Sequence, residues 1–189
     1  MFKEKEVRSH LTVTIVYFLI ITILRFKLDW NIFSLWLGAL VGTFFLDIDH
    51  FVFWFITHPE RSDSLEAKKI VECREFKTKE KTKQLFNLLK GAHNSHNRLV
   101  FHSLIGQILL FILAIYILTS SGSLFASAFI MSINLHLLKD EWDSFRQDKN
   151  HLADWLFWQI REPKAKVYLN EYLIAATLLF LIFTSLLLK

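Results

Sequence analysis

Two short segments of the chain place acids and histidines at spacings that suit the binding of a metal ion. The segment HLLKD puts His136 and Asp140 four residues apart, which on a helix brings both side chains to one face. The segment DIDH adds Asp47, Asp49 and His50. Imidazole and carboxylate groups are the ligands that zinc and other first-row divalent metals take in proteins. The sequence therefore predicts a divalent-metal site, with zinc as the first choice.

A third segment, HNRLVFHS, supplies His96, Arg98, His102 and Ser103. Arg98 suits a phosphate group because its guanidinium forks onto two oxygens, although an arginine at a helix start also reaches the membrane boundary without binding anything. Ser103 is expected to form hydrogen bonds beside the site, since the chain carries no nucleophile motif of the GxSxG type. Arg98 and Ser103 are the candidate substrate contacts.

The acids lie within or beside apolar segments, where a charge is costly. An ionised aspartate deep in a membrane costs about 2.5 to 3.5 kcal/mol, and a divalent cation offsets this cost by neutralising carboxylates. The alternative interpretation is that such groups only mark helix ends. We adopt it for His10, His58 and His151, because none has an acid on the same face within an apolar span. His93 is left open as a loop residue or a ligand.

Transmembrane helices are the elements expected to position these groups. With 53% hydrophobic residues, 19 Phe and 6 Trp, the chain of 189 residues is more apolar than a soluble domain of this size needs. A spanning helix requires roughly 20 mostly apolar residues. We predict an all-α integral membrane protein forming one domain, 1–189, with about five spans at 11–26, 30 to 50 or 56, 99–119, 124–140 and 172–188.

Positive charge is concentrated between these spans, in two predicted loops at 57–98 and 141–168. Lysines and arginines number 3 before the first span, 10 from Arg61 to Arg98 and 6 from Lys139 to Lys166, against 3 on the opposite side. This bias predicts a multi-pass protein of the inner (cytoplasmic) membrane, with the N-terminus and both loops in the cytoplasm and the C-terminus outside. The charge then favours membrane lipid as a partner, and no nucleic-acid partner is expected.

Each predicted loop is expected to carry an amphipathic helix at the membrane surface, at 78–92 and 150–163, with Asn150 as the cap of the second. The lone Cys73 cannot form an internal disulfide, so we place it on a reducing face. The basic N-terminal stretch resembles a signal peptide, but no small-residue cleavage site follows its apolar run. We therefore predict that it is retained as the first span.

The ordered set DIDH, HNRLVFHS and HLLKD resembles the membrane-bound metal-dependent hydrolases, also described as LexA-binding, inner-membrane-associated hydrolases, over about 42–143. Asn97 separates the histidine and arginine that are adjacent in that family, and no glycine follows Arg98, so His93 is an alternative to His96 as a ligand. The resemblance implies remote kinship with zinc-dependent phospholipase C and P1 nuclease. It also implies metal ligands at Asp47, Asp49, His50, His96, His102, His136 and Asp140.

The expected function is metal-assisted hydrolysis of a phosphoester at the cytoplasmic membrane boundary. A site at that depth favours an amphiphilic substrate, such as a phospholipid or an isoprenoid phosphate. Asp47 or Asp49 would act as a further ligand or as the base. Two alternatives remain: a scaffold or regulator that binds a protein partner through its basic loops, and a small transporter, which would need a path to the opposite face.

Overall fold

The computed structural model describes residues 2–26, 30–92, 96, 98–160 and 163–189, and the described ranges are helical without any strand. The predicted all-α class is therefore confirmed. The elements are α1 (Phe2–Arg25), α2 (Asn31–Phe45), α3 (Ile48–Val52), a π-helical turn (Phe53–Thr57), α4 (Ser62–Glu72), α5 (Thr78–Ala92), α6 (Leu104–Ser120), α7 (Leu124–Gln147), α8 (Lys149–Leu156), a 3-10 segment (Pro163–Tyr168) and α9 (Leu169–Leu187).

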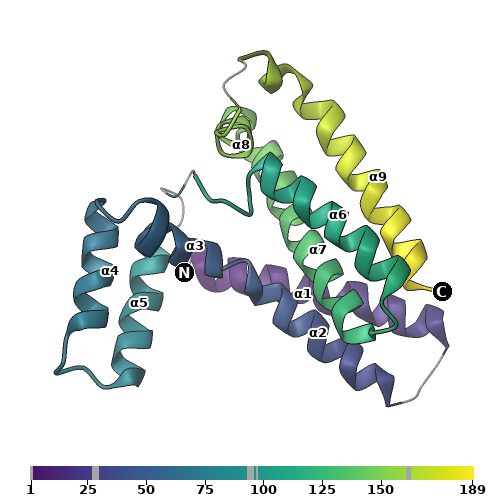
Figure 1. Cartoon of the computed structure of the whole chain (residues 1–189), viewed down its shortest axis with the longest axis horizontal. Coiled ribbons are helices and arrows are strands. Elements are labelled where there is room, and N and C mark those ends of the chain that lie inside the picture. The colour runs from purple at the N-terminus through teal and green to yellow at the C-terminus, as the bar shows by residue number, and fades with distance from the viewer. Residues whose placement is uncertain (1, 27–29, 93–95, 97, 161–162) are drawn as a thin grey trace.

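Helix α7 is the centre of a bundle and packs against α1, α2, α6 and α9 (Figure 1). The hairpin of α4 and α5 projects from one end of this bundle. The same end carries the N-terminus, α3, the start of α6 and α8, while the C-terminus lies at the other end. Segments that are distant in sequence and carry the candidate site residues are thus gathered at one end of the bundle.

Two glycines on α2 allow its backbone to touch that of α7. A Cβ atom at Gly38 would lie 2.2 Å from the carbonyl oxygen of Phe125, and one at Gly42 would lie 2.4 Å from that of Phe129. Close approach through small residues spaced four apart is typical of helix packing within membranes. Buried hydroxyls continue the contact, since Thr43 Oγ1 lies 3.0 Å from Ser132 Oγ. This contact fixes α2 against α7 near the candidate site.

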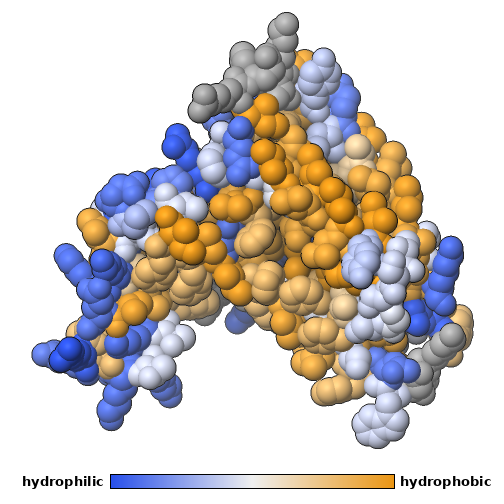
Figure 2. Space-filling view, in the orientation of Figure 1, coloured by the Kyte–Doolittle hydropathy of each residue, from blue (hydrophilic) through white to orange (hydrophobic). Residues whose placement is uncertain are grey.

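Three helical stretches are long and apolar enough to cross a membrane: Arg8–Arg25, Asn31–Thr57 and Lys166–Leu187. They correspond to the first, second and fifth predicted spans. Helix α6 is apolar but has only 17 residues, and α7 is buried along its middle and carries charge toward its end. Apolar side chains cover much of the visible bundle surface, whereas the α4–α5 hairpin is largely hydrophilic (Figure 2). These features support membrane association through at least three helices.

Helices are present in both predicted loop ranges, with one correction to a cap. Helix α5 occupies the predicted range, but α8 is shorter than expected and begins earlier. Asp148, and not Asn150, is the cap: its Oδ1 accepts hydrogen bonds from the backbone N–H groups of Asn150 and His151 at 2.9 and 3.2 Å. Carboxylates are strong caps because they accept from the free N–H groups of the first turn. Helix α8 buries Leu152 and Leu156 completely.

Candidate metal centre

The predicted pair on α7 faces a histidine from α1. His136 Nε2 lies 3.2 Å from Asp140 Oδ2, as the four-residue spacing predicts. His10 Nε2 lies 3.0 Å from Asp140 Oδ1, and the rings of His10 and His136 stack with their centroids 4.0 Å apart. His10 is 8% exposed and contacts Asp140, so our expectation that it only marks a helix end was wrong. Three donor groups therefore meet at one point.

The spacing of these donors fits a bound cation. One donor atom from each of His10, His136 and Asp140 lies within 4.8 Å of the other two. Two ligands held about 2.1 Å from a tetrahedral ion are separated by about 3.4 Å. The two imidazole–carboxylate distances, 3.2 Å to one oxygen of Asp140 and 3.0 Å to the other, lie within a few tenths of an ångström of that value. Two imidazoles and one carboxylate are also a ligand set found in catalytic zinc sites. The residues present therefore fit a divalent metal ion.

A break between α2 and α3 orients His136. At the break, the N–H of Asp47 bonds to the carbonyl of Phe44 at 3.2 Å, one residue short of its α-helical partner Thr43. The carbonyl oxygen of Thr43 is instead 2.7 Å from His136 Nδ1, which must donate because a carbonyl only accepts. Because Nδ1 keeps its proton, Nε2 is the nitrogen that a metal ion would take, in place of the proton that it otherwise shares with Asp140 Oδ2 at 3.2 Å.

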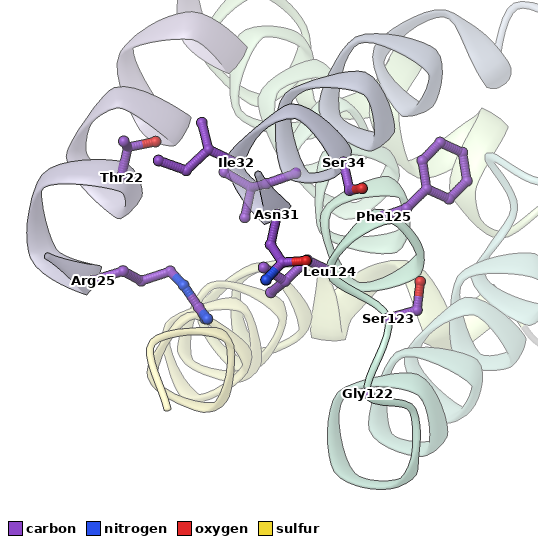
Figure 3. Close-up of a pocket in the computed structure, with 10 residues that line it drawn as sticks. Thr22, Arg25, Asn31, Ile32, Ser34, Gly122, Ser123, Leu124 and Phe125 are labelled. Carbon is purple, nitrogen blue, oxygen red and sulfur yellow. The ribbon is translucent and has the colours of Figure 1, made fainter. Parts of the chain in front are cut away.

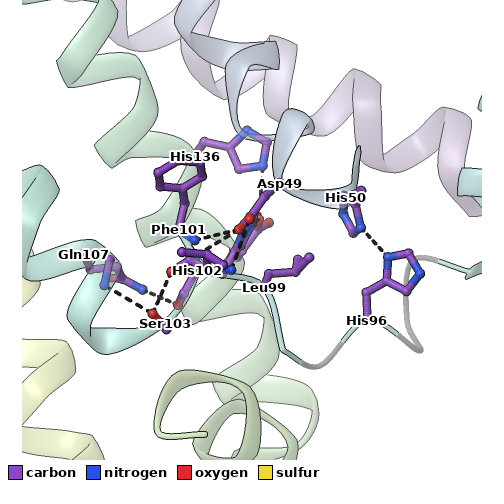
Figure 4. A network of polar contacts seen from close by, with 12 residues as sticks. Asp49, His50, His96, Leu99, Phe101, His102, Ser103, Gln107 and His136 are labelled. Atoms are coloured by element: carbon purple, nitrogen blue, oxygen red, sulfur yellow. Dashed lines mark hydrogen bonds and ion pairs between the residues drawn. The ribbon is translucent and has the colours of Figure 1, made fainter. Parts of the chain in front are cut away.

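Asp49 positions His102, the residue that precedes Ser103 at the start of α6. Its carboxylate is fully buried and accepts hydrogen bonds from the backbone N–H groups of Val100, Phe101 and His102 at 3.1, 2.7 and 3.3 Å (Figure 4). The same carboxylate lies 3.0 Å from His102 Nδ1. An ionised acceptor at Nδ1 holds the proton there and leaves the lone pair on Nε2.

His102 reaches toward the pair on α7. Its Nε2 lies 4.0 Å from Asp140 Oδ2, and its ring centroid is 6.4 Å from that of His136. A carboxylate behind the imidazole and an open nitrogen in front form the arrangement that proteins use for metal-binding histidines. His102 is thus a fourth donor at the edge of the group, held by the DIDH segment through Asp49.

His50 and His96 form a separate pair. Their Nδ1 atoms lie 2.8 Å apart, and His96 Nε2 lies 2.6 Å from Oδ2 of Asp63 on α4. Burial by itself would raise the pKa of the Asp63 carboxyl, but hydrogen bonds from His96, Trp54 and Arg61 outweigh that effect and lower its pKa to about 2. The imidazole of His96 is therefore paired with an ionised carboxylate.

Asp47, Arg98 and Ser103 are the remaining predicted residues that the structure describes. Asp47 is half-buried at the N-terminal end of α3, and Arg98 is exposed. Ser103 is fully buried and caps α6: its Oγ donates to the Val100 carbonyl at 2.6 Å and accepts from the Gly106 N–H at 3.2 Å. His93 lies outside the described residues.

A buried polar network behind His102 was not predicted. Gln107 Nε2 donates to the His102 carbonyl at 3.0 Å, and the hydroxyl of Tyr172 on α9 lies against both Gln107 Oε1 and Glu141 Oε1, the latter at 2.9 Å. Glu141, next to Asp140 in the chain, is 1% exposed. This network ties α6, α7 and α9 together beside the candidate centre.

Sequence reasoning missed His10, Asp63 and Glu141 as parts of these groups. A signal for His10 existed, because it lies at the same predicted end of its span as Asp140 does. No comparable signal pointed to Asp63, since its contacts join the α4–α5 hairpin to a segment 33 residues away.

The opposite end of the bundle contains a cavity of about 440 Å³ (Figure 3). Arg25 lies at its edge and donates a hydrogen bond to the carbonyl of Leu187 near the end of α9. Its lining includes Thr22, Asn31, Ser34 and Ser123, and no acid or histidine is among the described residues that line it. Among the described residues of these two regions, acids and histidines therefore occur at the end that carries α3 and α8.

Comparison with known proteins gives no relative for this chain. No family model matches it, and no curated protein or solved structure matches it either.

Proposed function

We propose that this protein is a membrane-embedded, metal-dependent hydrolase that acts on a phosphoester of an amphiphilic substrate. The observation that carries the proposal is the meeting of His10, His136 and Asp140 beside His102, within a chain rich in membrane-type helices. Ionisable groups among such helices are costly and functional by default. A phospholipid or an isoprenoid phosphate is the proposed class of substrate, and the resemblance to membrane-bound metal-dependent hydrolases agrees with it.

The chain's own residues have distinct roles in this proposal. His10, His136 and Asp140 hold the ion, and His102 completes the set from the loop that Asp49 orders. A bound divalent ion, zinc by the ligand set, supplies Lewis acidity and lowers the pKa of water from 15.7 to about 7. Mixed imidazole and carboxylate ligands suit that ion.

Two further residues act on the substrate side in this proposal. The half-buried Asp47, at the break between α2 and α3, is the candidate base that takes a proton from the attacking water. The exposed Arg98 binds phosphate oxygens at the membrane boundary.

The membrane arrangement is part of the same proposal. Helices α6 and α7 are the additional spans, and the N-terminus, the α4–α5 hairpin and α8 face the cytoplasm. This orientation is supported by the excess of 19 over 3 lysines and arginines, and by the gathering of those elements at one end of the bundle. The metal centre then opens at the cytoplasmic boundary, where a phosphate headgroup can reach it.

The test compares two histidine variants. The wild type, His136→Ala and His151→Ala are purified in detergent, checked for monodispersity and analysed for bound metals and for hydrolysis of a phospholipid and an isoprenoid phosphate. We expect one ion or more per chain and activity in the wild type and in His151→Ala. His136→Ala should lose at least one ion per chain and the activity, because a donor is removed from the centre.

Equal metal content in the wild type and in His136→Ala would overturn the metal assignment. Metal bound by the wild type without hydrolysis of either substrate would favour the scaffold alternative. Metal accumulation by sealed proteoliposomes would favour the transporter alternative.

A further inference from the structure

The cavity at the start of α2 and α7 has no part in the proposed hydrolysis. Its volume of about 440 Å³ lies within the range of about 300 to 1,000 Å³ that is usual for sites that bind small molecules. The last turn of α1 and the connection between α6 and α7 complete its wall (Figure 3). Each of these parts contributes polar side chains, so the cavity can hold a polar group.

Arg25 gives this cavity a positive charge. No acid offsets that charge among the described residues that line the cavity. Nη1 of Arg25 donates to the carbonyl of Leu187, and this contact uses only one of the five N–H donors of a guanidinium. Figure 3 shows the side chains of Arg25 and Asn31 extending toward the same space. The cavity therefore favours an anion that accepts several hydrogen bonds.

The backbone of α2 and α7 adds to this positive field. Gly38 of α2 lies against Phe125 of α7. Four residues further along both helices, Gly42 lies against Phe129, so the two helices are parallel and begin at the same end. Aligned peptide dipoles place about half an elementary positive charge at each helix N-terminus. Both of these termini contribute to the wall around Arg25.

The surroundings of the cavity indicate the depth of lipid headgroups. Trp30 directly precedes α2 and is 93% exposed, and Tyr116 is exposed near the end of α6. Tryptophan and tyrosine are enriched at the boundary between the membrane and water. Ile23 and Leu24 are exposed on the last turn of α1, where acyl chains would cover them. A polar cavity beside an apolar surface fits an amphiphile with an anionic headgroup.

We propose that this cavity binds the phosphate headgroup of an anionic phospholipid, whose acyl chains lie along the exposed apolar side chains of α1 and α2. Arg25 supplies the charge and a planar set of donors that matches phosphate oxygens. The hydroxyls of Ser34 and Ser123 supply further hydrogen bonds. The inference goes beyond the proposed function, because the site lies at the other end of the bundle and binds its lipid without cleaving it.

Native mass spectrometry of the full-length protein in detergent, titrated with phosphatidylglycerol, tests the inference. We expect the wild type to bind a first phosphatidylglycerol more tightly than it binds phosphatidylcholine. Arg25→Gln should weaken this first binding about 10- to 100-fold, because a hydrogen-bonded charge is lost. Ser34→Phe should weaken it as strongly, since the ring occupies the cavity while every charge remains.

Arg74→Gln is the matched control. It removes the same charge from an exposed position between α4 and α5, so its affinity for phosphatidylglycerol should equal that of the wild type. All three variants should keep the zinc content of the wild type, because the cavity is remote from the proposed metal centre. The lipid measurement needs neither metal nor hydrolysis, so the two proposals can fail separately.

Three outcomes would contradict the inference. Equal affinity for phosphatidylglycerol in the wild type, Arg25→Gln and Ser34→Phe would overturn it. Phosphatidylcholine that binds as tightly as phosphatidylglycerol would refute the recognition of charge. Displacement of the lipid by an equal concentration of inorganic phosphate would show that the occupant is a free anion. Ser34→Phe leaves the contact between Arg25 and Leu187 in place, so it decides the question even if Arg25→Gln fails to fold.

Discussion

Asp49 is the residue that holds His102 at the edge of the candidate centre. Its buried charge is tolerated because three backbone N–H groups and one imidazole surround it. Hydrogen bonds to an ionised acceptor are about twice as strong as neutral ones. The carboxylate therefore has two effects: it folds the segment that precedes α6, and it selects the His102 nitrogen that faces Asp140.

Asp49→Asn is expected to destabilise the protein and loosen His102. The amide keeps the size but loses the charge, and its NH₂ group turns a donor toward backbone donors. Buried groups left unpaired cost about 1 to 3 kcal/mol, so we expect a loss of about 2 kcal/mol or more. For a protein of this length this corresponds to a fall of about 4 to 8 °C in the unfolding midpoint, measured by tryptophan fluorescence in detergent.

Asp154→Asn is the matched control for this prediction. Asp154 pairs with Lys166, but both side chains are more than half exposed, and exposed pairs contribute about 0 to 1 kcal/mol. An equal shift of the midpoint in both variants would show that the contacts of Asp49 contribute no more than an ordinary surface pair.

At the scale of single residues, spacing along the sequence predicted the contact within one helix. It did not predict the contacts between helices. The distance between His136 and Asp140 follows from the helical repeat alone. The approach of His10 to Asp140 depends on how α1 crosses α7, which no local pattern in the sequence specifies. The same holds for Asp63 and His96, whose contact requires the α4–α5 hairpin to fold back onto the end of the bundle.

At the level of elements, the contact between α2 and α7 links the packing of the helices to the orientation of His136 in the candidate centre. Gly42 brings the two backbones together, and the next residue, Thr43, offers its carbonyl to His136. That carbonyl is available because the helix breaks before α3. Hydropathy predicted one span over this region, and the break escaped prediction because Leu46 and Asp47 are not helix-breaking residues.

Gly42→Ala should weaken both the fold and the metal centre. The added methyl carbon would lie 2.4 Å from the Phe129 carbonyl oxygen and 2.9 Å from Ser132 Cβ, so α2 must move away from α7. Overpacking of this kind costs about 1 to 3 kcal/mol, and the movement should lengthen the hydrogen bond from His136 to Thr43. Thermal unfolding and zinc titration of the purified variant measure the two effects.

Gly122→Ala is the control for that substitution. Apart from its two chain neighbours, no described residue has an atom within 4 Å of a Cβ built at Gly122, between α6 and α7. Its unfolding midpoint and zinc affinity should match those of the wild type. If Gly42→Ala behaved in the same way, close packing of α2 on α7 would not be what positions His136.

At the level of the whole molecule, charge and apolar surface are separated along the bundle. Apolar side chains are exposed along helices α1, α2, α6 and α9, where lipid would cover them. The basic hairpin and the candidate centre lie together at one end. Composition and hydropathy were sufficient to predict this division, because both depend on sums over many residues and not on individual contacts.

The single native cysteine offers a direct test of the proposed orientation. Cys73 is a free, half-buried thiol at the end of α4, on the hairpin that we place in the cytoplasm. A membrane-impermeant maleimide should label it in inverted vesicles and not in intact cells. Combining Cys73→Ser with Gly122→Cys moves the thiol to the loop between α6 and α7, at the other end of the bundle, and should reverse the pattern. Labelling of Cys73 in intact cells would reverse the assigned orientation and place the metal centre at the outer face, where a cytoplasmic substrate could not reach it.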